Sequence, residues 1–212
     1  MKAEAIVLVG PPGVGKGTVG ERIAHEGRIP YIGMSNVMRA NFAKDPEFER
    51  YAKSLMEKRL LLPDSVTNRL WHDAILSIQG YADMVLDGYP RTAAQFEFMR
   101  EKLLALDVQP VVVIFEATYE VTNDRRLDRI AKMRAKGQDP RPDDLREEIH
   151  REGFETYQRE LAGIMERIRF RDTFHHKVKA NRDPETVYRE VVSHFHLPHI
   201  NTNMNVGELT AQ

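Results

Sequence analysis

The glycine-rich stretch GPPGVGKGT, which we call the phosphate loop, restricts the fold more than any other feature of the sequence. It follows an apolar, β-branched run, and its residues Gly10, Gly15 and Lys16 match the phosphate-binding pattern G-x-x-x-x-G-K. The pattern then breaks, because Gly17 stands where a serine or threonine is usual and Thr18 comes one residue late. A loop of this kind directs backbone N–H groups and a helix dipole at one point. It predicts a phosphate site, whereas a structural turn with an exposed lysine would not require the preceding strand or this spacing.

Five apolar runs alternate with helical patterns along the chain. The first, EAIVLVG, has no polar alternation, as expected for a strand that is covered on both faces of a parallel sheet. Between the runs, three aspartate and proline pairs each place a capping group and a proline at a helix start, and so predict a side-chain cap there. The alternation predicts an α/β fold with a doubly wound, parallel five-stranded sheet, whose ligands bind at the carboxyl ends of the strands. The runs lie at residues 4–10, 30–33, 83–88, 110–117 and 173–180, and the pairs are Asp45-Pro46, Pro63-Asp64 and Asp183-Pro184.

The composition excludes several classes of protein. The 212 residues are 42% hydrophobic and 30% charged, which suits one domain over residues 1–197 followed by a C-terminal tail, residues 198–212. A formal charge of -1 provides no overall field for nucleic acid or an anionic membrane. The chain has no cysteine, and no run approaches the roughly 20 apolar residues of a membrane span. We therefore expect a cytoplasmic monomer that binds neither nucleic acid nor membrane.

A second motif is LDGYPRT, in which Asp87 ends an apolar strand. In a parallel sheet this carboxylate points into the same crevice as the phosphate loop. It can hold the water shell of a magnesium ion that already bridges two phosphates. A metal held in that way needs no direct hydroxyl ligand, which would account for Gly17. Taken alone, Asp87 is better explained as an ordinary aspartate at a strand end.

The phosphate loop together with LDGYPRT resembles the nucleoside monophosphate kinase family, and adenylate kinases most closely, over residues 5–192. The order Gly-Lys-Gly-Thr is typical of that family. The resemblance implies a P-loop NTP hydrolase-like fold and a reversible, Mg²⁺-dependent phosphoryl transfer from ATP to AMP. It also implies a small helical acceptor-binding segment at about residues 33–62 and a short lid at about residues 125–144. Such enzymes work by positioning and charge neutralisation, without a protein nucleophile.

The resemblance also assigns roles to individual residues. It implies that Arg125 stacks on the donor adenine, that Gln95 bonds the acceptor adenine, and that Asp143 and Asp144 serve as lid hinge and pairing groups. The implied catalytic residues are Lys16, Asp87, Arg91, Arg129 and Arg141, with Asp87 holding the metal through water. The implied ATP-binding residues are Gly10, Gly13, Gly15, Lys16, Gly17, Thr18, Arg125 and Arg129, and the implied acceptor-binding residues are Met34, Arg39, Gly88, Arg91, Gln95 and Arg141.

Several of these residues have a structural alternative. Arg39 could be a solvated helix charge, and the lid arginines could belong to a solvated charged helix. The spacing of Thr92 and Gln95 also fits a capping box, in which the glutamine only satisfies the helix start. For the whole chain, the alternatives are a UMP/CMP-type kinase and a nucleotide-binding regulatory module without turnover.

Two departures from the family pattern bear on these alternatives. A second clamp arginine usually lies four residues before the position of Tyr157, where this chain has Gly153. The nearest candidate is Arg151, whose direction differs because each helical residue turns by about 100°. In the stretch IGMSNVMR, residues 34–36 are Met, Ser and Asn where the family has Thr, Gly and an acid. Met34 cannot reproduce a hydroxyl contact, so Met34, Ser35 and Asn36 leave the acceptor base open.

Overall fold

A parallel five-stranded sheet forms the centre of the computed structural model, which describes residues 2–57, 61–78, 83–140 and 142–197. The strand order is β2-β3-β1-β4-β5, and every neighbouring pair is parallel. This arrangement confirms the predicted doubly wound α/β fold. The strands are β1 (Ala3–Val9), β2 (Tyr31–Gly33), β3 (Met84–Asp87), β4 (Val108–Glu116) and β5 (His175–Lys179).

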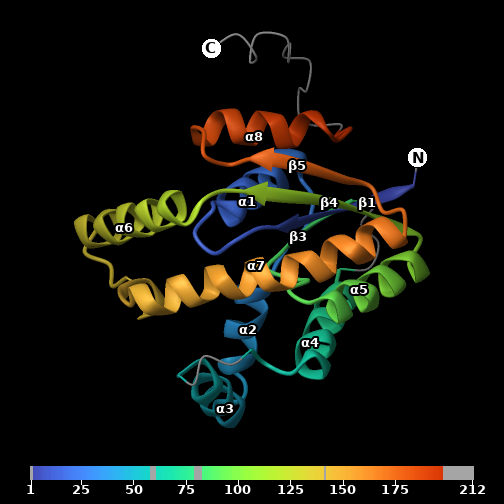
Figure 1. The fold of residues 1–212 in the computed structure, drawn as a ribbon. Coiled ribbons are helices and arrows are strands. Elements are labelled where there is room, and N and C mark those ends of the chain that lie inside the picture. Colours follow the sequence, from blue (N-terminus) through green and yellow to red (C-terminus); the bar gives the residue numbers. More distant parts are fainter. Residues whose placement is uncertain (1, 58–60, 79–82, 141, 198–212) are drawn as a thin grey trace.

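Helices cover both faces of the sheet (Figure 1). One hydrophobic cluster joins the sheet to α4, α5 and α7, and the other joins it to α1 and α8. The short helices α2 and α3 extend away from the sheet, while α6 lies beyond the carboxyl ends of the strands (Figure 1). The helices are α1 (Lys16–Gly27), α2 (Met34–Phe42), α3 (Pro46–Glu57), α4 (Asp64–Leu76), α5 (Ala93–Ala105), α6 (Tyr119–Ala135), α7 (Glu147–Phe170) and α8 (Pro184–Ser193), with the 3-10 turn η1 (Pro142–Leu145).

The continuous apolar run of β1 is explained by burial on both faces. Ala5, Val7 and Val9 face the cluster that contains α4, α5 and α7. Ile6 and Leu8 face the opposite cluster, which contains α1 and α8. None of the five side chains is more than 3% exposed, so each face of the strand contributes to a core.

The predicted runs match the observed strands closely, with one informative difference in β4. The strand begins at Val108, two residues before the predicted start, and Pro110 therefore lies inside it. Val112 donates its backbone N–H to the carbonyl of Phe174, and Pro110, two residues earlier, faces the same side. Because β5 pairs with β4 only from Val112 onward, the missing N–H of Pro110 leaves no ladder bond unmade.

Two of the three predicted helix caps are confirmed. The Asp45 carboxylate accepts hydrogen bonds from the N–H groups of Glu47 and Phe48, and Asp183 accepts one from Thr186. The prediction of a side-chain cap at Asp64 is wrong, because α4 has Pro63 at its N-cap position and no side-chain cap. The Asp64 carboxylate accepts instead from groups on α5 and its cap, which form a tertiary contact that outweighs the local one.

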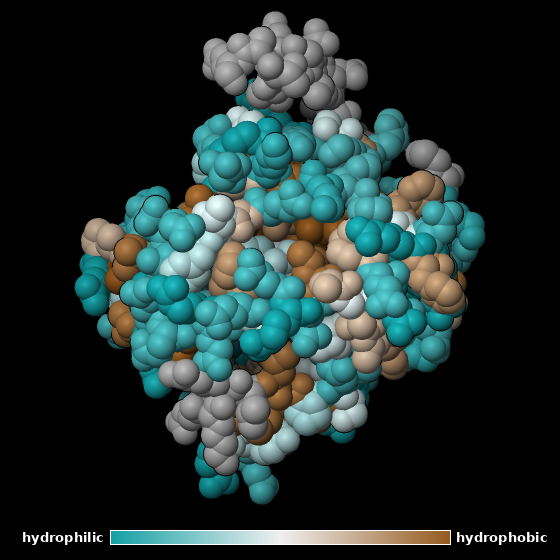
Figure 2. All heavy atoms as spheres, in the orientation of Figure 1, coloured by the Kyte–Doolittle hydropathy of each residue, from teal (hydrophilic) through white to brown (hydrophobic). Residues whose placement is uncertain are grey.

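The surface seen in Figure 2 is mostly hydrophilic, with hydrophobic residues exposed in small separate areas. This distribution agrees with the 30% of charged residues in the sequence and with a core confined to the two faces of the sheet. In the part of the chain that the structure describes, no helix is long and apolar enough to cross a bilayer.

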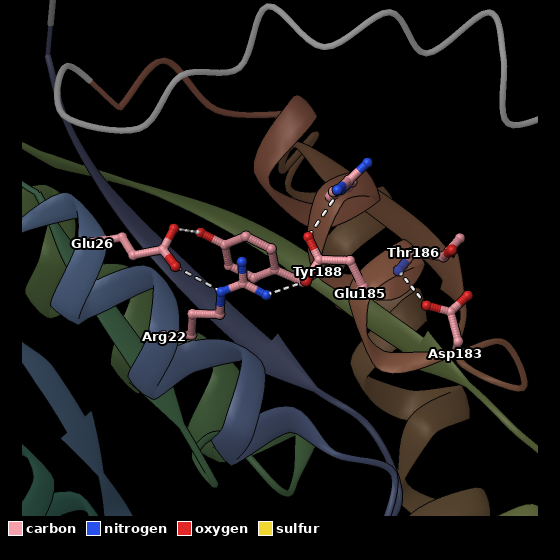
Figure 3. A network of polar contacts seen from close by, with 7 residues as sticks. Arg22, Glu26, Asp183, Glu185, Thr186 and Tyr188 are labelled. Atoms are coloured by element: carbon pink, nitrogen blue, oxygen red, sulfur yellow. Dashed lines mark hydrogen bonds and ion pairs between the residues drawn. The ribbon is translucent and has the colours of Figure 1, made fainter.

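A network of polar contacts ties α8 to α1, the helix that begins at Lys16 (Figure 3). Arg22 donates to Glu26 over 2.7 Å and to Glu185 over 2.5 Å. Its guanidinium carbon lies 3.7 Å from the centre of the Tyr188 ring, a cation–π contact. The Tyr188 hydroxyl donates to the other oxygen of Glu26 over 2.5 Å. The network therefore fixes α1 to α8 on the face of the sheet opposite to the one that α5 and α7 cover.

The Tyr188→Phe variant tests this attachment, because it removes one hydrogen bond and keeps the ring beneath Arg22. We expect the free energy of unfolding to fall by about 1 kcal/mol, measured by urea denaturation. Arg189→Gln is the matched control, since Arg189 bonds Glu185 at the surface and its loss should change stability by less than about 0.5 kcal/mol. Equal losses in both variants would contradict a specific role for the Tyr188 hydroxyl.

Candidate active site

The phosphate loop joins β1 to α1 and contains two residues in the left-handed region of backbone space. These are Gly13, with φ +79°, and Gly15, with φ +97°, which is also the N-cap of α1. A glycine at the N-cap supplies no side chain to the first turn. The N–H groups of that turn, where the positive end of the helix dipole lies, are therefore free of a side-chain cap and suited to an anion.

Lys16 folds back over the phosphate loop. Its ammonium group donates to the carbonyl oxygens of Gly10 and Pro11 over 2.6 Å and 2.8 Å. Desolvation lowers the pKa of the Lys16 ammonium to about 8; Asp87 opposes this shift and Arg91 adds to it. The three side chains are thus close enough to influence one another, and an anion in the loop would restore the charge that desolvation disfavours.

Asp87 lies against the phosphate loop, as the sequence predicts. Its Oδ2 accepts a 2.8 Å hydrogen bond from the Tyr31 hydroxyl. Its Oδ1 is buried and has no hydrogen-bond partner among the described residues. A Cβ at Gly17 would lie 3.4 Å from Oδ2 of Asp87 and 3.6 Å from the Tyr31 oxygen. The residue that breaks the phosphate-binding pattern therefore lies directly beside the carboxylate.

Three residues that the sequence assigned to an acceptor meet at the end of β3. Met34 is buried at the start of α2, and a Cβ at Gly88 would lie 3.4 Å from the Cβ of Met34. The Nε of Arg91 donates to the Gly88 carbonyl over 3.0 Å. Arg39 is exposed and donates to Asn36 one turn earlier in α2, so it is not brought into this group. Ser35 and Asn36 are also exposed.

Gln95 is only 3% exposed, and its side-chain amide is bonded within the protein. Its carbonyl accepts the backbone N–H of Arg91 over 2.7 Å, and its amino group donates to Asp64 over 2.8 Å and to Thr67 over 3.1 Å. The Thr92 hydroxyl accepts the Gln95 N–H, as in the predicted capping pattern. In a capping box the glutamine side chain would accept the N–H of the cap residue, Thr92. Here it accepts the N–H of Arg91, the residue before the cap, and so it fixes the backbone of Arg91.

The two lid arginines predicted on one face of a helix lie on α6 and have different partners. Arg125 donates to the carbonyl of Val14 in the phosphate loop over 2.6 Å, and to the carbonyls of Ala180 and Arg182 after β5 over 2.6 Å and 2.9 Å. Arg129 forms a two-pronged ion pair with the Asp144 carboxylate, which confirms Asp144 as a pairing group. Thr18 is exposed at the start of α1. Arg141 and the Asp143 side chain lie outside the described residues.

Helix α7 passes beside the phosphate loop at Gly153. A Cβ at this position would lie 3.4 Å from the Cγ of Pro12, so the place of the missing clamp arginine faces the loop. Arg151 points elsewhere, because it donates to Glu147 over 3.1 Å and lies 4.2 Å from the centre of the Tyr119 ring. Arg151 therefore does not occupy the place of the missing arginine.

Three buried polar residues on α6 and α7 were missed in the sequence, and two of them lie beside the phosphate loop. The three are Thr122, Arg126 and His150, which are at most 6% exposed. A Cβ at Gly13 would lie 2.8 Å from the Thr122 carbonyl oxygen and 3.0 Å from the Cε1 of His150. The signal available in the sequence was the four-residue spacing of Thr122 and Arg126, which puts both on one helix face.

Comparisons with known proteins agree with this geometry. The family model for adenylate kinase matches residues 8–172 of the chain. An adenylate kinase of Thermoanaerobacter sp. (strain X514) is 39% identical over 127 residues, a match that spans 58% of this chain and 58% of that protein. Adenylate kinases of Bifidobacterium longum and Deinococcus radiodurans are 35% and 30% identical, over 76% and 92% of this chain and 83% and 98% of the relative.

The close packing around Gly13 predicts that a side chain at this position will destabilise the protein. In Gly13→Ala, a Cβ would meet the Thr122 carbonyl in a backbone conformation that already disfavours alanine, and we expect a loss of more than about 2 kcal/mol in the free energy of unfolding. Gly137→Ala is the matched control, since Gly137 has φ +66° but no atom within 4 Å of the added Cβ. Urea denaturation of both variants separates the contact from the backbone strain, and equal losses would contradict the contact.

Proposed function

The chain belongs to the adenylate kinase family, and on this basis we propose that it catalyses the reversible, magnesium-dependent transfer of a phosphoryl group from ATP to AMP, giving two ADP. The observation that carries the proposal is the convergence of Lys16, Asp87 and Arg91 at the phosphate loop. The charges of Asp87 and Arg91 both act on the Lys16 ammonium and influence its pKa. Two cations and a carboxylate at a helix N-terminus suit a reaction in which phosphate charge must be neutralised.

We propose that ATP binds along the phosphate loop. Its phosphates would take the place of the Gly10 and Pro11 carbonyls as partners of the Lys16 ammonium. Gly13, Gly15, Gly17 and Thr18 would contribute backbone N–H groups, since the glycines leave the inside of the loop without side chains. Arg125 is suited to the donor base because its guanidinium already bonds both the loop and the segment after β5.

Asp87 fits a magnesium ion that is bound through water. Its Oδ1 is a buried carboxylate oxygen with no hydrogen-bond partner among the described residues, and magnesium prefers oxygen ligands while keeping several of its waters. The ion, when bound, supplies positive charge to the phosphates. Tyr31 would hold the carboxylate in place through its hydrogen bond to Oδ2. Gly17 lies beside Asp87, so the carboxylate adjoins the phosphate loop.

We propose that AMP binds between Met34 and Arg91, within an acceptor segment at residues 33–62. Met34 can pack against the base, and Arg91 and Gly88 lie at the same end of β3. Arg39 would reach the acceptor phosphate after giving up its bond to Asn36. The amino group of Gln95 would give up its hydrogen bond to Asp64 or to Thr67 and donate to the adenine instead.

Charge neutralisation during transfer would come from arginines on both sides of the site. Arg91 is fixed by its neighbours, whereas Arg129 and Arg141 belong to the proposed lid at residues 125–144. Guanidinium groups suit the charge that spreads over a transferring phosphoryl group. Closure of the lid would release Arg129 from Asp144 and bring it to the phosphates. We further propose a cytoplasmic monomer that acts on nucleotides, which the absence of cysteine and the charge of -1 support.

A coupled ADP-production assay tests the proposal. With ATP and magnesium, we expect turnover of AMP to exceed that of CMP, UMP and GMP, and Lys16→Ala to reduce it by at least about 100-fold because the phosphates lose their fixed cation. Faster turnover of UMP or CMP would identify a pyrimidine nucleotide kinase instead. Binding of ATP without turnover of any acceptor would identify a regulatory module.

A second prediction concerns Gly153, the position at which this chain lacks the clamp arginine of the family pattern. In Gly153→Arg, the new side chain starts 3.4 Å from Pro12 and extends along the phosphate loop, so we expect turnover to rise at least about tenfold. Gly153→Ala is the control, because it stabilises the helix by about 0.5 to 1 kcal/mol without adding charge. An equal rate in the two variants would contradict the idea that this position faces the transferred phosphoryl group.

A further inference from the structure

Four buried polar side chains gather where α6, η1 and α7 meet beside the phosphate loop. They are Thr122, Arg126, Asp144 and His150, and we call them the polar seam. In the described part of the chain only Gln95 and Thr173 are buried polar residues outside it. Buried polar groups cost stability unless they are bonded, so their concentration at one place requires a reason.

The hydrogen bonds of Thr122 determine which nitrogen of His150 carries a proton. The Thr122 hydroxyl has one hydrogen, and it is donated to the Tyr119 carbonyl over 2.8 Å. The Nε2 of His150 lies 3.2 Å from the same oxygen. Since the hydroxyl hydrogen is already used, Nε2 must be the donor and Thr122 the acceptor. The imidazole is therefore the Nε2–H tautomer when it is neutral.

The same imidazole contacts the phosphate loop. A Cβ at Gly13 would lie 3.0 Å from the Cε1 of His150, and 2.8 Å from the carbonyl of its partner Thr122. Gly13 has φ +79°, a conformation that glycine adopts readily and that other residues rarely adopt. The Gly13 turn therefore packs directly against His150 and Thr122.

The charges around His150 favour its neutral form. Burial lowers the pKa of the imidazole, and Arg126 and Arg129 of α6 lower it further. Asp144 of η1 and Glu147 of α7 oppose this shift. The ring of Tyr119 covers the imidazole, with 5.6 Å between the ring centres. A proton added to the ring would therefore place a third cation beside two arginines.

We propose that His150 is a positioning residue for the phosphate loop, which as a neutral Nε2–H imidazole holds the Gly13 turn against α6 and so keeps the loop shaped for ATP. This role rests on the proposed function of the loop and acts through Gly13, without contact to the phosphates. It connects the lid helices to ATP binding, because His150 on α7 bonds Thr122 on α6, and Arg126 on the same face of α6 bonds the backbone of Asp144 in η1.

Two variants of the full chain test the proposal. His150→Met keeps similar bulk and loses the donor, whereas His150→Gln keeps an N–H donor at a similar reach. In the ADP assay we expect the Met variant to raise the KM for ATP about fivefold, with kcat and the KM for AMP within about twofold of wild type. The Gln variant should restore the KM for ATP to within about twofold.

The pH profile adds a readout that a purely structural role would not change. Because the pKa of His150 lies below its ordinary value of 6.5, the wild-type KM for MgATP should stay constant down to that pH and rise below it. His150→Gln cannot titrate, so its profile should lack this rise, and it also corrects for protonation of ATP. A rise of equal size in both proteins would overturn the proposal.

The tautomer is measured separately from activity, by ¹⁵N NMR of the imidazole groups at pH 7, with His150→Gln identifying the His150 signal. An Nε2–H tautomer is expected, and an Nδ1–H tautomer or a charged ring would overturn the proposal. An unchanged KM for ATP in His150→Met, or equal defects in the two variants, would also overturn it. If the wild type lacked turnover, the proposed function would fail, and calorimetric ATP affinity of the same variants would decide the role of His150.

Discussion

The burial of β1 on both faces is the constraint on which the candidate site depends. Because helices cover both sides, the strand is fixed in register with β3 and β4, and Leu8 pairs with Asp87 while Val9 pairs with Ile114. The chain therefore leaves the sheet at Gly10 directly beside the carboxylate that ends β3. The distance between the phosphate loop and Asp87, the aspartate proposed to hold the metal, is in this way set by the core.

Gly10 and Gly13 of the phosphate loop are explained by packing as well as by the approach of a ligand. A Cβ at Gly10 would lie 2.8 Å from the Cβ of Phe115, and one at Gly13 would meet the polar seam, whereas one at Gly17 would lie in ordinary contact with Asp87. Each glycine thus adjoins a different element of the fold, namely β4, α6 with α7, and β3. The loop is enclosed by the structure on its outer side, which leaves its inner side to bind an anion.

The sequence predicted the fold because its apolar runs coincide with strands buried on two faces, a property that each run carries locally. It failed for Asp64, whose capping pattern is local but whose carboxylate bonds Gln95, 31 positions away in the chain. It also missed Arg126, which is buried next to an exposed Leu127, the reverse of what residue type suggests. The spacing of Thr122 and Arg126 places both on one helix face, but the partners of Asp64 and Arg126 lie on distant segments, which no spacing along the chain encodes.

The partners of the basic residues imply an order of events at the site. Lys16 bonds only neutral carbonyl oxygens in the contacts described, and a phosphate attracts a cation more strongly than a carbonyl does. Arg129 is held by the Asp144 carboxylate, and its release separates opposite charges in a partly buried place. In the proposed function, Lys16 would therefore exchange its partners for phosphate at small cost, whereas Arg129 of the proposed lid would require the charge already brought by a bound nucleotide. This difference in partners favours donor binding before rearrangement of the proposed lid, with the polar seam adjoining both parts.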